Sequence, residues 1–264
     1  MIRVGVLGAA GRMGQQVSRA VEDDPDLALV AAIDPQASGQ SIGALIGTPE
    51  NPVKISEELD KLLQAEVEVA VDFTTPATVM DNVRWAIEHA VHIVVGTTGI
   101  SAEQLGEIEY LLEKEGGESN VIVAPNFAIG AVLMQRFAAE AARFFPAVEI
   151  IELHHDGKVD APSGTALDTA MRLAKEREAW NGPDDESMAG VRGGDLDGVR
   201  VHSVRLPGLV AHQEIIFGAP GQTLTIRHDS LDRASFMPGV LLAIKAIHGR
   251  PGLTVGLEPL LDAQ

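Results

Sequence analysis

The feature that most restricts the fold of this chain is a glycine-punctuated turn directly after its first apolar segment. Ile2 to Leu7 is an apolar run, and Gly8, Gly11 and Gly14 follow it at the start of an amphipathic helical pattern. A strand, a glycine turn and a helix in this order are typical of the first unit of a dinucleotide-binding domain. A tight turn that binds nothing is the simplest alternative, because glycines alone are a weak signal.

A carboxylate at the end of the next apolar run strengthens the cofactor interpretation. This run ends on Asp34, about twenty residues past Gly14, where an acid accepts hydrogen bonds from adenosine ribose hydroxyls. The following Pro35 cannot pair with a 2'-phosphate as an arginine would, so these residues favour NADH, although Arg12 is available to a phosphate. The sequence therefore predicts a site for NADH or NADPH.

Strands and helices continue to alternate up to residue 126. Apolar runs at 67–73, 92–95 and 121–124 are separated by helical patterns, the first of which should have Thr75 as N-cap and Pro76 as its first residue. This alternation predicts an α/β fold with a Rossmann-like, doubly wound parallel sheet. Because ligands of such sheets bind at the carboxyl ends of the strands, the short loops at 73–75, 96–98 and 125–127 are candidates for cofactor contacts.

The pattern changes after residue 127. A helical segment at 129–145 precedes strands at 199–206, 210–217 and 222–227, and the short turns between these strands predict a second α+β domain with a mainly antiparallel sheet. The segment from Trp180 to Asp197 is rich in Gly, Asp and Pro, so we expect an exposed, mobile connection there.

Two domains follow from this change of pattern. We expect a dinucleotide-binding domain at 1–126, to which residues 235–264 return, and a substrate-binding and oligomerisation domain at 127–234. The second sheet has too few helices to cover both faces, and such a face is a usual place for subunit association.

Charge and composition exclude several classes of function. The net charge of -18 argues against nucleic acid or an anionic membrane as partner, because both need basic surface. No apolar run is long enough to span a bilayer and no signal-peptide layout is present, so we expect a cytoplasmic protein. The absence of cysteine excludes a disulfide framework, thiolate metal sites and cysteine nucleophiles.

The chemically richest stretch runs from Glu152 to Thr165. The strand expected at 149–153 delivers His154 and His155 to an Asp-Gly turn, and Lys158 follows on an exposed bend. Two histidines and a lysine are therefore gathered in one short loop.

A helix should follow this loop. Ser163 is the expected N-cap, after Pro162, and the expected apolar face consists of Leu167, Ala170, Met171 and Ala174. The backbone amides of Gly164 and Thr165 then lie at a helix N-terminus, which favours a carboxylate or phosphate.

Simpler explanations exist for each of these residues taken alone. Loop histidines, a solvated lysine and an ordinary helix cap are common on protein surfaces, and only their convergence points to a site. We expect no metal site, because adjacent histidines at a strand end point in different directions and the spacing matches no common zinc pattern. A serine hydrolase is also disfavoured, since Pro-Ser-Gly-Thr lacks the glycines of a nucleophile elbow.

Four segments together resemble the 4-hydroxy-tetrahydrodipicolinate reductase family. They are Gly8-Ala-Ala-Gly-Arg-Met-Gly14, Gly96-Thr-Thr98, Ala124-Pro-Asn-Phe127 and Glu152-Leu-His-His-Asp-Gly-Lys-Val-Asp-Ala-Pro-Ser-Gly-Thr165. The resemblance spans the whole chain, and its last segment is the most specific. Many members of the family carry a basic residue after the acid, where this chain has Pro35.

The resemblance implies reduction of a cyclic dicarboxylate on the diaminopimelate route to lysine, with hydride from NADH or NADPH. It also implies a homotetramer built through the second-domain sheets. His154 would be the general acid/base and Lys158 a companion proton donor, and the substrate would be bound by His155, Lys158, Ser163, Gly164 and Thr165. The cofactor would be bound by Gly8, Ala9, Ala10, Gly11, Arg12, Met13, Asp34, Phe73, Gly96, Thr97, Thr98, Ala124, Pro125, Asn126 and Phe127.

Two other hypotheses are open at this point. Another NAD(P)-dependent oxidoreductase of similar build would turn over a different substrate and would not need His154. A non-catalytic dinucleotide sensor would bind NADH without turnover and would have no use for the histidine-lysine loop.

Overall fold

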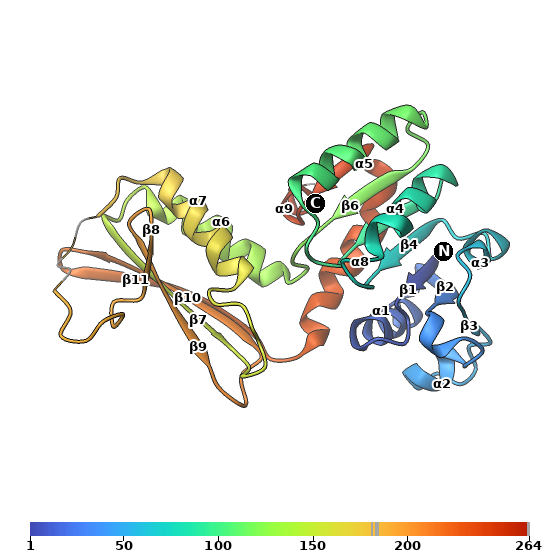
Figure 1. The fold of residues 1–264 in the computed structure, drawn as a ribbon, viewed down its shortest axis with the longest axis horizontal. Coiled ribbons are helices and arrows are strands. Elements are labelled where there is room, and N and C mark those ends of the chain that lie inside the picture. The colour runs from blue at the N-terminus through green and yellow to red at the C-terminus, as the bar shows by residue number, and fades with distance from the viewer. Residues whose placement is uncertain (181, 183–184, 263–264) are drawn as a thin grey trace. The chain divides into compact units, whose positions relative to one another are not determined.

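The computed structural model describes residues 1–180, 182 and 185–262, and these form two compact units (Figure 1). The first unit contains Met1–Phe127 together with the chain from Phe236 onward, and the second contains Ala128–Ser235. Among the described residues, none of the helices is both long and apolar enough to cross a bilayer.

The first unit is built on a seven-stranded parallel sheet with the strand order β12-β6-β5-β4-β1-β2-β3. Its strands are β1 (Ile2–Leu7), β2 (Leu27–Ile33), β3 (Ile55–Ser56), β4 (Val69–Asp72), β5 (His92–Val95), β6 (Asn120–Val123) and β12 (Gly252–Val255). The central strands are nearly continuous runs of buried apolar residues, as expected for a sheet covered on both faces. The predicted doubly wound, Rossmann-like sheet is confirmed.

Helices connect these strands and cover the sheet. They are α1 (Arg12–Asp23), α2 (Ile42–Ile46), α3 (Asp60–Gln64), α4 (Val79–Glu88), α5 (Ala102–Lys114), α8 (Met237–Ala246) and α9 (Glu258–Leu261), with short 3-10 turns at Pro35–Ala37 and Ile247–Gly249. The helices α4 and α5 pack on one face of the sheet, where Val83, Ile108 and Ile93 share one core, while α1 and α8 contact each other.

The first turn of α4 differs from the sequence prediction. The helix begins at Val79 rather than at Pro76, because residues 75–78 form a separate turn closed by a 3.0 Å hydrogen bond from the Thr78 amide to the Thr75 carbonyl. The helix α5 begins with a capping box, in which the Ser101 and Gln104 side chains each accept a hydrogen bond from the other residue's backbone amide.

The second unit is a five-stranded sheet with two helices against one face. Its elements are α6 (Ile129–Ala142), β7 (Ala147–His154), α7 (Gly164–Glu176), β8 (Gly194–Leu196), β9 (Val199–Arg205), β10 (Ala211–Ala219) and β11 (Gln222–Ser230), and a 3-10 turn at Arg233–Phe236 ends it. The strand order is β11-β10-β7-β9-β8, and every pair is antiparallel except β7 with β9. Figure 1 shows α6 and α7 on the same side of this sheet.

The mainly antiparallel sheet is confirmed, but the neighbours of two strands are not those expected from the sequence. The strands β9 and β10 are consecutive along the chain, yet β7 lies between them in the sheet. The short turn between β9 and β10 predicted that these two strands would pair as a hairpin. Each of them pairs with β7 instead, β10 in the antiparallel and β9 in the parallel direction. The strand β8 also lies inside the segment expected to be a mobile connection, of which Asn181, Pro183 and Asp184 fall outside the described residues.

The buried face of α7 is also different from the predicted one. Ala166, Thr169, Ala170 and Leu173 are buried under the helix, while Leu167 is 37% exposed and Met171 47% exposed. Small residues face the sheet because α7 packs closely on β7 and on α6, which contributes Met134, Ala138 and Ala142 to the same core. Each buried position is therefore one residue earlier in the chain than the predicted one.

The boundaries of the units differ by one residue from the expected domain boundaries. Phe127 belongs to the first unit, where its ring lies 5.9 Å from that of Phe73. Ser235 belongs to the second unit, where its hydroxyl donates to Ser230 at 3.1 Å.

Candidate active site

The glycine turn of the first unit leaves the N-terminus of α1 open to a ligand. Gly8 has a φ of +74°, and a Cβ atom there would lie 2.4 Å from the Phe73 carbonyl oxygen, so only glycine fits. Gly11 is the N-cap of α1 and supplies no side-chain hydrogen bond to the first turn. Arg12 is exposed and Met13 half-buried at the start of the helix. Amides left uncapped at a helix N-terminus suit the pyrophosphate of a dinucleotide.

Asp34 is tied to this turn. Its carboxylate accepts the backbone amides of Ala10 and Gln36, each at 3.0 Å, and the amides of Gly8 and Ala9 bind the Ile33 carbonyl at 2.8 and 3.1 Å. Since an ionised carboxylate offers about four acceptor positions, Asp34 retains capacity for ribose hydroxyls. The structure thus brings the glycine turn and Asp34 together.

The loops after β4, β5 and β6 also converge. A Cβ atom on Gly96 would lie 2.2 Å from the Phe73 ring, so the ring packs directly on that glycine. The rings of Phe73 and Phe127 are 5.9 Å apart at an angle of 51°. Thr97 and Ala124 are buried, Asn126 is half-buried, and Thr98 and Pro125 are exposed. The predicted cofactor residues of these loops therefore gather at one edge of the sheet.

Sequence reasoning missed Asp72, the last residue of β4. Its buried carboxylate accepts hydrogen bonds from the Thr74 amide and hydroxyl at 3.0 and 2.8 Å, the Thr97 hydroxyl at 2.7 Å and the Asn82 side chain at 2.7 Å. Asp72 thereby joins the loop after β4 to the loop after β5. A buried acid at the end of a strand among apolar residues was the available signal.

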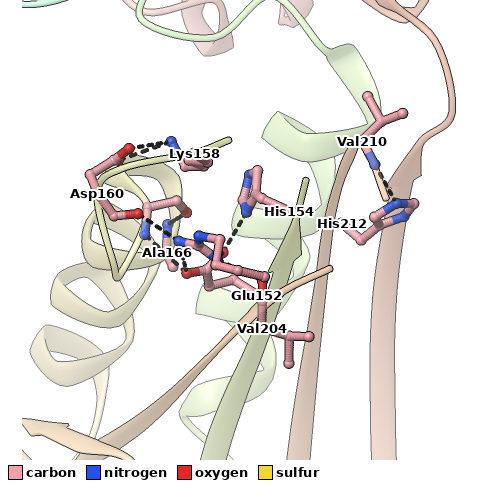
Figure 2. Close-up of polar contacts among 10 residues, drawn as sticks. Glu152, His154, Lys158, Asp160, Ala166, Val204, Val210 and His212 are labelled. Atoms are coloured by element: carbon pink, nitrogen blue, oxygen red, sulfur yellow. Dashed lines mark hydrogen bonds and ion pairs between the residues drawn. The ribbon is translucent and has the colours of Figure 1, made fainter. Parts of the chain in front are cut away.

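In the second unit, His154 ends β7 and rests on Glu152. The two side chains lie on the same face of the strand, and the His154 Nδ1 atom forms a short hydrogen bond with the Glu152 carboxylate (Figure 2). The Glu152 side chain is 0% exposed and that of His154 is 14% exposed. An ionised carboxylate is only an acceptor, so Nδ1 carries the proton and Nε2 remains for a ligand.

Both groups have shifted pKa values. Burial opposes ionisation of Glu152, but hydrogen bonds from Arg205, Ser203 and His154 lower its pKa below the ordinary value. Burial lowers the pKa of His154, and the positive charges of Lys158 and Arg205 act in the same direction, against the Glu152 carboxylate, which raises it. The imidazolium form of His154 is therefore a stronger acid than a histidine in water.

Arg205 is the second group that sequence reasoning missed. Its Nη1 and Nη2 atoms donate to the two oxygens of Glu152 at 3.0 and 2.8 Å, and Nη2 also donates to the Asp160 carbonyl at 2.6 Å. Arg205 lies 53 residues from Glu152 along the chain and reaches it because β9 pairs with β7. No local sequence pattern marks it.

Lys158 and His155 lie on the loop after β7. The Lys158 ammonium donates to both oxygens of the Asp160 carboxylate at 2.7 and 2.9 Å. Figure 2 shows Lys158 and Asp160 on the loop beside His154. His155 is exposed, and its carbonyl accepts the Lys158 amide at 3.1 Å.

The N-terminus of α7 completes this group of residues. Ser163 is buried, and its hydroxyl accepts the Ala166 amide at 3.1 Å, so the predicted N-cap is confirmed. The Ser163 amide donates to Glu152 at 3.3 Å. Gly164 is exposed, and a Cβ atom there would meet no atom within 4 Å, so the backbone of the first turn is accessible. A titratable ring, an ammonium group and a helix N-terminus are thus brought into one region that can bind an anion and transfer a proton.

Comparisons with known families cover almost the whole chain. A family model described as dihydrodipicolinate reductase, N-terminus, matches residues 2–127, and one described as dihydrodipicolinate reductase, C-terminus, matches residues 130–261. A 4-hydroxy-tetrahydrodipicolinate reductase of Nocardia farcinica is 52% identical over 99% of both chains. One of Corynebacterium aurimucosum is 51% identical over 98% of both chains.

Solved structures give the same result. A dipicolinate-bound dihydrodipicolinate reductase from Paenisporosarcina sp. TG-14 has a TM-score of 0.84 and 43% identity, over 98% of this chain and 99% of that one. An amine dehydrogenase from Mycobacterium smegmatis, at 17% identity and a TM-score of 0.66 over 96% and 94% of the chains, shares the fold alone.

Proposed function

This chain belongs to the dihydrodipicolinate reductase family and is an NAD(P)H-dependent oxidoreductase, and we propose that it reduces the cyclic dicarboxylate of the diaminopimelate route to lysine. One observation carries the proposal. His154 is held at Nδ1 by a buried carboxylate, on the loop that bears Lys158 and beside the N-terminus of α7.

The cofactor of this reaction is NADH or NADPH, and the residues of the first unit fit it. The uncapped amides of α1 after Gly11 suit the pyrophosphate, and the remaining acceptor positions of Asp34 suit the adenosine ribose. The loops at Phe73, Gly96–Thr98 and Ala124–Phe127 are the proposed contacts of the nicotinamide half. When bound, the reduced nicotinamide supplies the hydride.

His154 is the proposed general acid. Hydride addition to an electron-poor carbon of a conjugated imine leaves negative charge on the substrate, and this charge is neutralised by a proton. His154 donates that proton from Nε2 while Nδ1 stays bound to Glu152, and its lowered pKa makes the imidazolium a ready donor. Lys158 is the proposed companion donor. General acid catalysis contributes about a hundredfold to ten-thousandfold in rate.

The substrate carboxylates are the proposed ligands of the helix N-terminus and the adjacent cations. The amides of Gly164 and Thr165 begin α7, behind the buried Ser163 cap, and the positive end of the helix dipole favours an anion. His155 and Lys158 supply the cationic partners. The chain carries a net charge of -18, so a dianionic substrate must be attracted by such local groups rather than by the overall field.

The proposal is tested by the initial rate of NADH and NADPH oxidation. The substrate is generated in place from pyruvate and aspartate semialdehyde by the preceding synthase, and the wild type is compared with H154A and K158A. Rapid oxidation that falls by about a hundredfold or more in both variants is expected. Binding of NADH without any oxidation would reject the reduction of this substrate and leave either an oxidoreductase with another substrate or a dinucleotide sensor.

We also propose a cytoplasmic homotetramer assembled through the second sheet. The helices α6 and α7 cover only one face of it, and on the other face Ile151, Leu153 and Ile216 are half-buried within the described chain. Light scattering should give a mass four times that of the chain. A monomer would reject this assembly.

A further inference from the structure

Arg205 touches the supports of both proposed proton donors. One guanidinium binds the Glu152 carboxylate through two parallel hydrogen bonds at 2.8 and 3.0 Å, and the same Nη2 atom binds the Asp160 carbonyl at 2.6 Å. Glu152 in turn holds His154, and the Asp160 side chain holds Lys158. The Arg205 side chain is 19% exposed and the Glu152 side chain 0% exposed, so the contact between them is largely shielded from water, whereas the contact with the Asp160 carbonyl is exposed.

The contact with Glu152 affects the protonation of His154. A fully buried carboxylate stays ionised only if cations and donors compensate for its lost hydration, and a bidentate guanidinium is the strongest such partner. An ionised Glu152 accepts the Nδ1 proton of His154 and leaves Nε2 as the titrating atom. The groups that face His154 are Glu152, Lys158 and Arg205.

The contact with Asp160 affects the loop. Lys158 and Asp160 are two residues apart on this loop, and Arg205 anchors the loop to the carboxyl end of β9. A lysine ammonium at position 205 would keep the charge but could not form the parallel pair with Glu152 and also reach the Asp160 carbonyl in the same geometry.

We propose that Arg205 is a positioning residue for both proton donors. Through Glu152 it fixes the protonation and orientation of the His154 ring. Through Asp160 it fixes the loop that presents Lys158. This inference rests on the proposed roles of His154 and Lys158. It assigns a positioning role to two side chains, Arg205 and Glu152, which do not themselves transfer the proton.

The chain contains a matched control for this arrangement. On the opposite face of β7, Glu149 binds the Arg192 guanidinium at 2.5 Å and the His202 Nε2 atom at 2.8 Å. Two glutamates of β7 therefore each bind an arginine and a histidine, Glu152 beside the loop and Glu149 away from it. The variants E149Q and R192K test the same chemical change outside the site. They serve as controls once light scattering shows that each has the same mass in solution as the wild type.

The first measurement is independent of activity. Nitrogen-15 NMR of the histidines should show His154 with its proton on Nδ1 in the wild type. In E152Q the amide can donate as well as accept, so a second population protonated on Nε2 and a lower His154 pKa are expected. In E149Q and R192K the His154 signals should be unchanged. An unaltered His154 in E152Q would overturn the first half of the proposal.

The second measurement separates the effect of Arg205 through Glu152 from its effect through Asp160. R205K and E152Q should each lower kcat by roughly tenfold or more with an unchanged KM for NADH. R205K should also weaken binding of pyridine-2,6-dicarboxylate by roughly tenfold, the effect of one charge-assisted hydrogen bond, whereas E152Q should not. In a K158A background this effect of R205K on binding should disappear.

Two results would contradict the inference. Equal losses in R205K and R192K would indicate a general effect on the sheet, and undiminished kcat in R205K would show that Arg205 positions nothing. A fully active H154A would reject the proposed acid, but the NMR result would still decide whether Glu152 and Arg205 control the His154 ring.

Discussion

Lys158 donates hydrogen bonds to both carboxylate oxygens of Asp160, at 2.7 and 2.9 Å. The ammonium proposed to bind a substrate carboxylate is thus already paired with a carboxylate of the protein, and the pKa of Asp160 is lowered by this contact. A bound dicarboxylate must compete with Asp160 for the same donors. The side chain at position 160 therefore influences the affinity of the site for a dicarboxylate.

The variant D160N should bind pyridine-2,6-dicarboxylate more tightly, by about three- to tenfold, because a neutral amide competes less well than a carboxylate for the Lys158 ammonium. Isothermal titration calorimetry measures this change. The control is D156N, which removes the same charge from the same exposed loop. An equal gain in both variants would mean that the net charge of the loop, not the ion pair, sets the affinity.

Asp72 should matter for cofactor binding although it is fully buried. The variant D72N replaces one acceptor oxygen by a donor that faces the Thr74, Thr97 or Asn82 donors, and such a mismatch costs about 1–3 kcal/mol. We expect a comparable loss of unfolding free energy and a Kd for NADH raised by about tenfold. The exposed Asp81→Asn on α4 should change neither quantity. Normal NADH affinity in a folded D72N protein would contradict this role.

The close approach of α1 to the glycine turn can be tested with two alanine substitutions. At Gly14 a Cβ atom would lie 2.0 Å from the Gly8 carbonyl oxygen, so G14A should be destabilised by about 2–3 kcal/mol and should bind NADH poorly. At Gly106, on the exposed face of α5, a Cβ atom meets nothing within 4 Å, so G106A should be stabilised by about 0.5–1 kcal/mol. Denaturant unfolding of both variants provides the comparison.

The cofactor preference should respond to the residue after Asp34. Pro35 is exposed, and P35R would place a cation where a 2'-phosphate is expected beside the ribose. The ratio of kcat/KM for NADPH to that for NADH should rise by about tenfold in P35R, while P35A should leave it nearly unchanged. An equal change in both variants would show that loss of the proline, not the new charge, controls the preference.

Acid should destabilise the first unit through His92. The Asn120 amide donates to His92 Nδ1 at 2.9 Å, so this nitrogen must be unprotonated, and burial together with the nearby His248 lowers the His92 pKa, against a raising effect of Glu68. The unfolded chain then takes up a proton near pH 6.5 that the folded chain resists. This contribution to stability is complete above that pH and is lost as the pH falls below it.

The variant H92N keeps an acceptor but removes the titration. Its free energy of unfolding should therefore decline less between pH 7.5 and 5.5 than that of the wild type, as measured by urea unfolding at both values. His89 on the exposed end of α4 is the matched control, and H89N should decline like the wild type. A wild-type pH dependence in H92N would exclude His92 as its source.

Much of the candidate site could be predicted because its residues act locally. The glycine turn, Asp34 and the Ser163 cap follow from backbone conformation and from hydrogen bonds that span a few residues. Glu152 lies within the segment that drew attention to His154, but the sequence suggested no role for it, since its burial depends on α7 packing on the sheet and on β9 pairing with β7. Arg205 had no sequence signal.

Two predictions about helices were wrong. The apolar stripe of α7 was assigned from hydrophobicity alone, yet close packing on the sheet selects Ala166, Thr169 and Ala170 for burial and leaves Met171 partly exposed. The start of α4 was assigned to Pro76, whereas a turn closed by Thr75 and Thr78 precedes the helix. In the first case tertiary packing outweighed hydrophobicity, and in the second a local turn took the place of the expected first helical turn.

The sequence by itself determined the alternation of strands and helices in the first unit, the run of strands in the second and the turn that suits a dinucleotide, because periodicity and capping depend on neighbouring residues. Only the tertiary structure decided that β7 lies between β9 and β10, and this register brings Arg205 to Glu152 across 53 residues. It likewise joined Asp72 to Thr97 across 25 residues. Such pairs depend on strand order, which the compact fold sets as a whole and no short segment encodes.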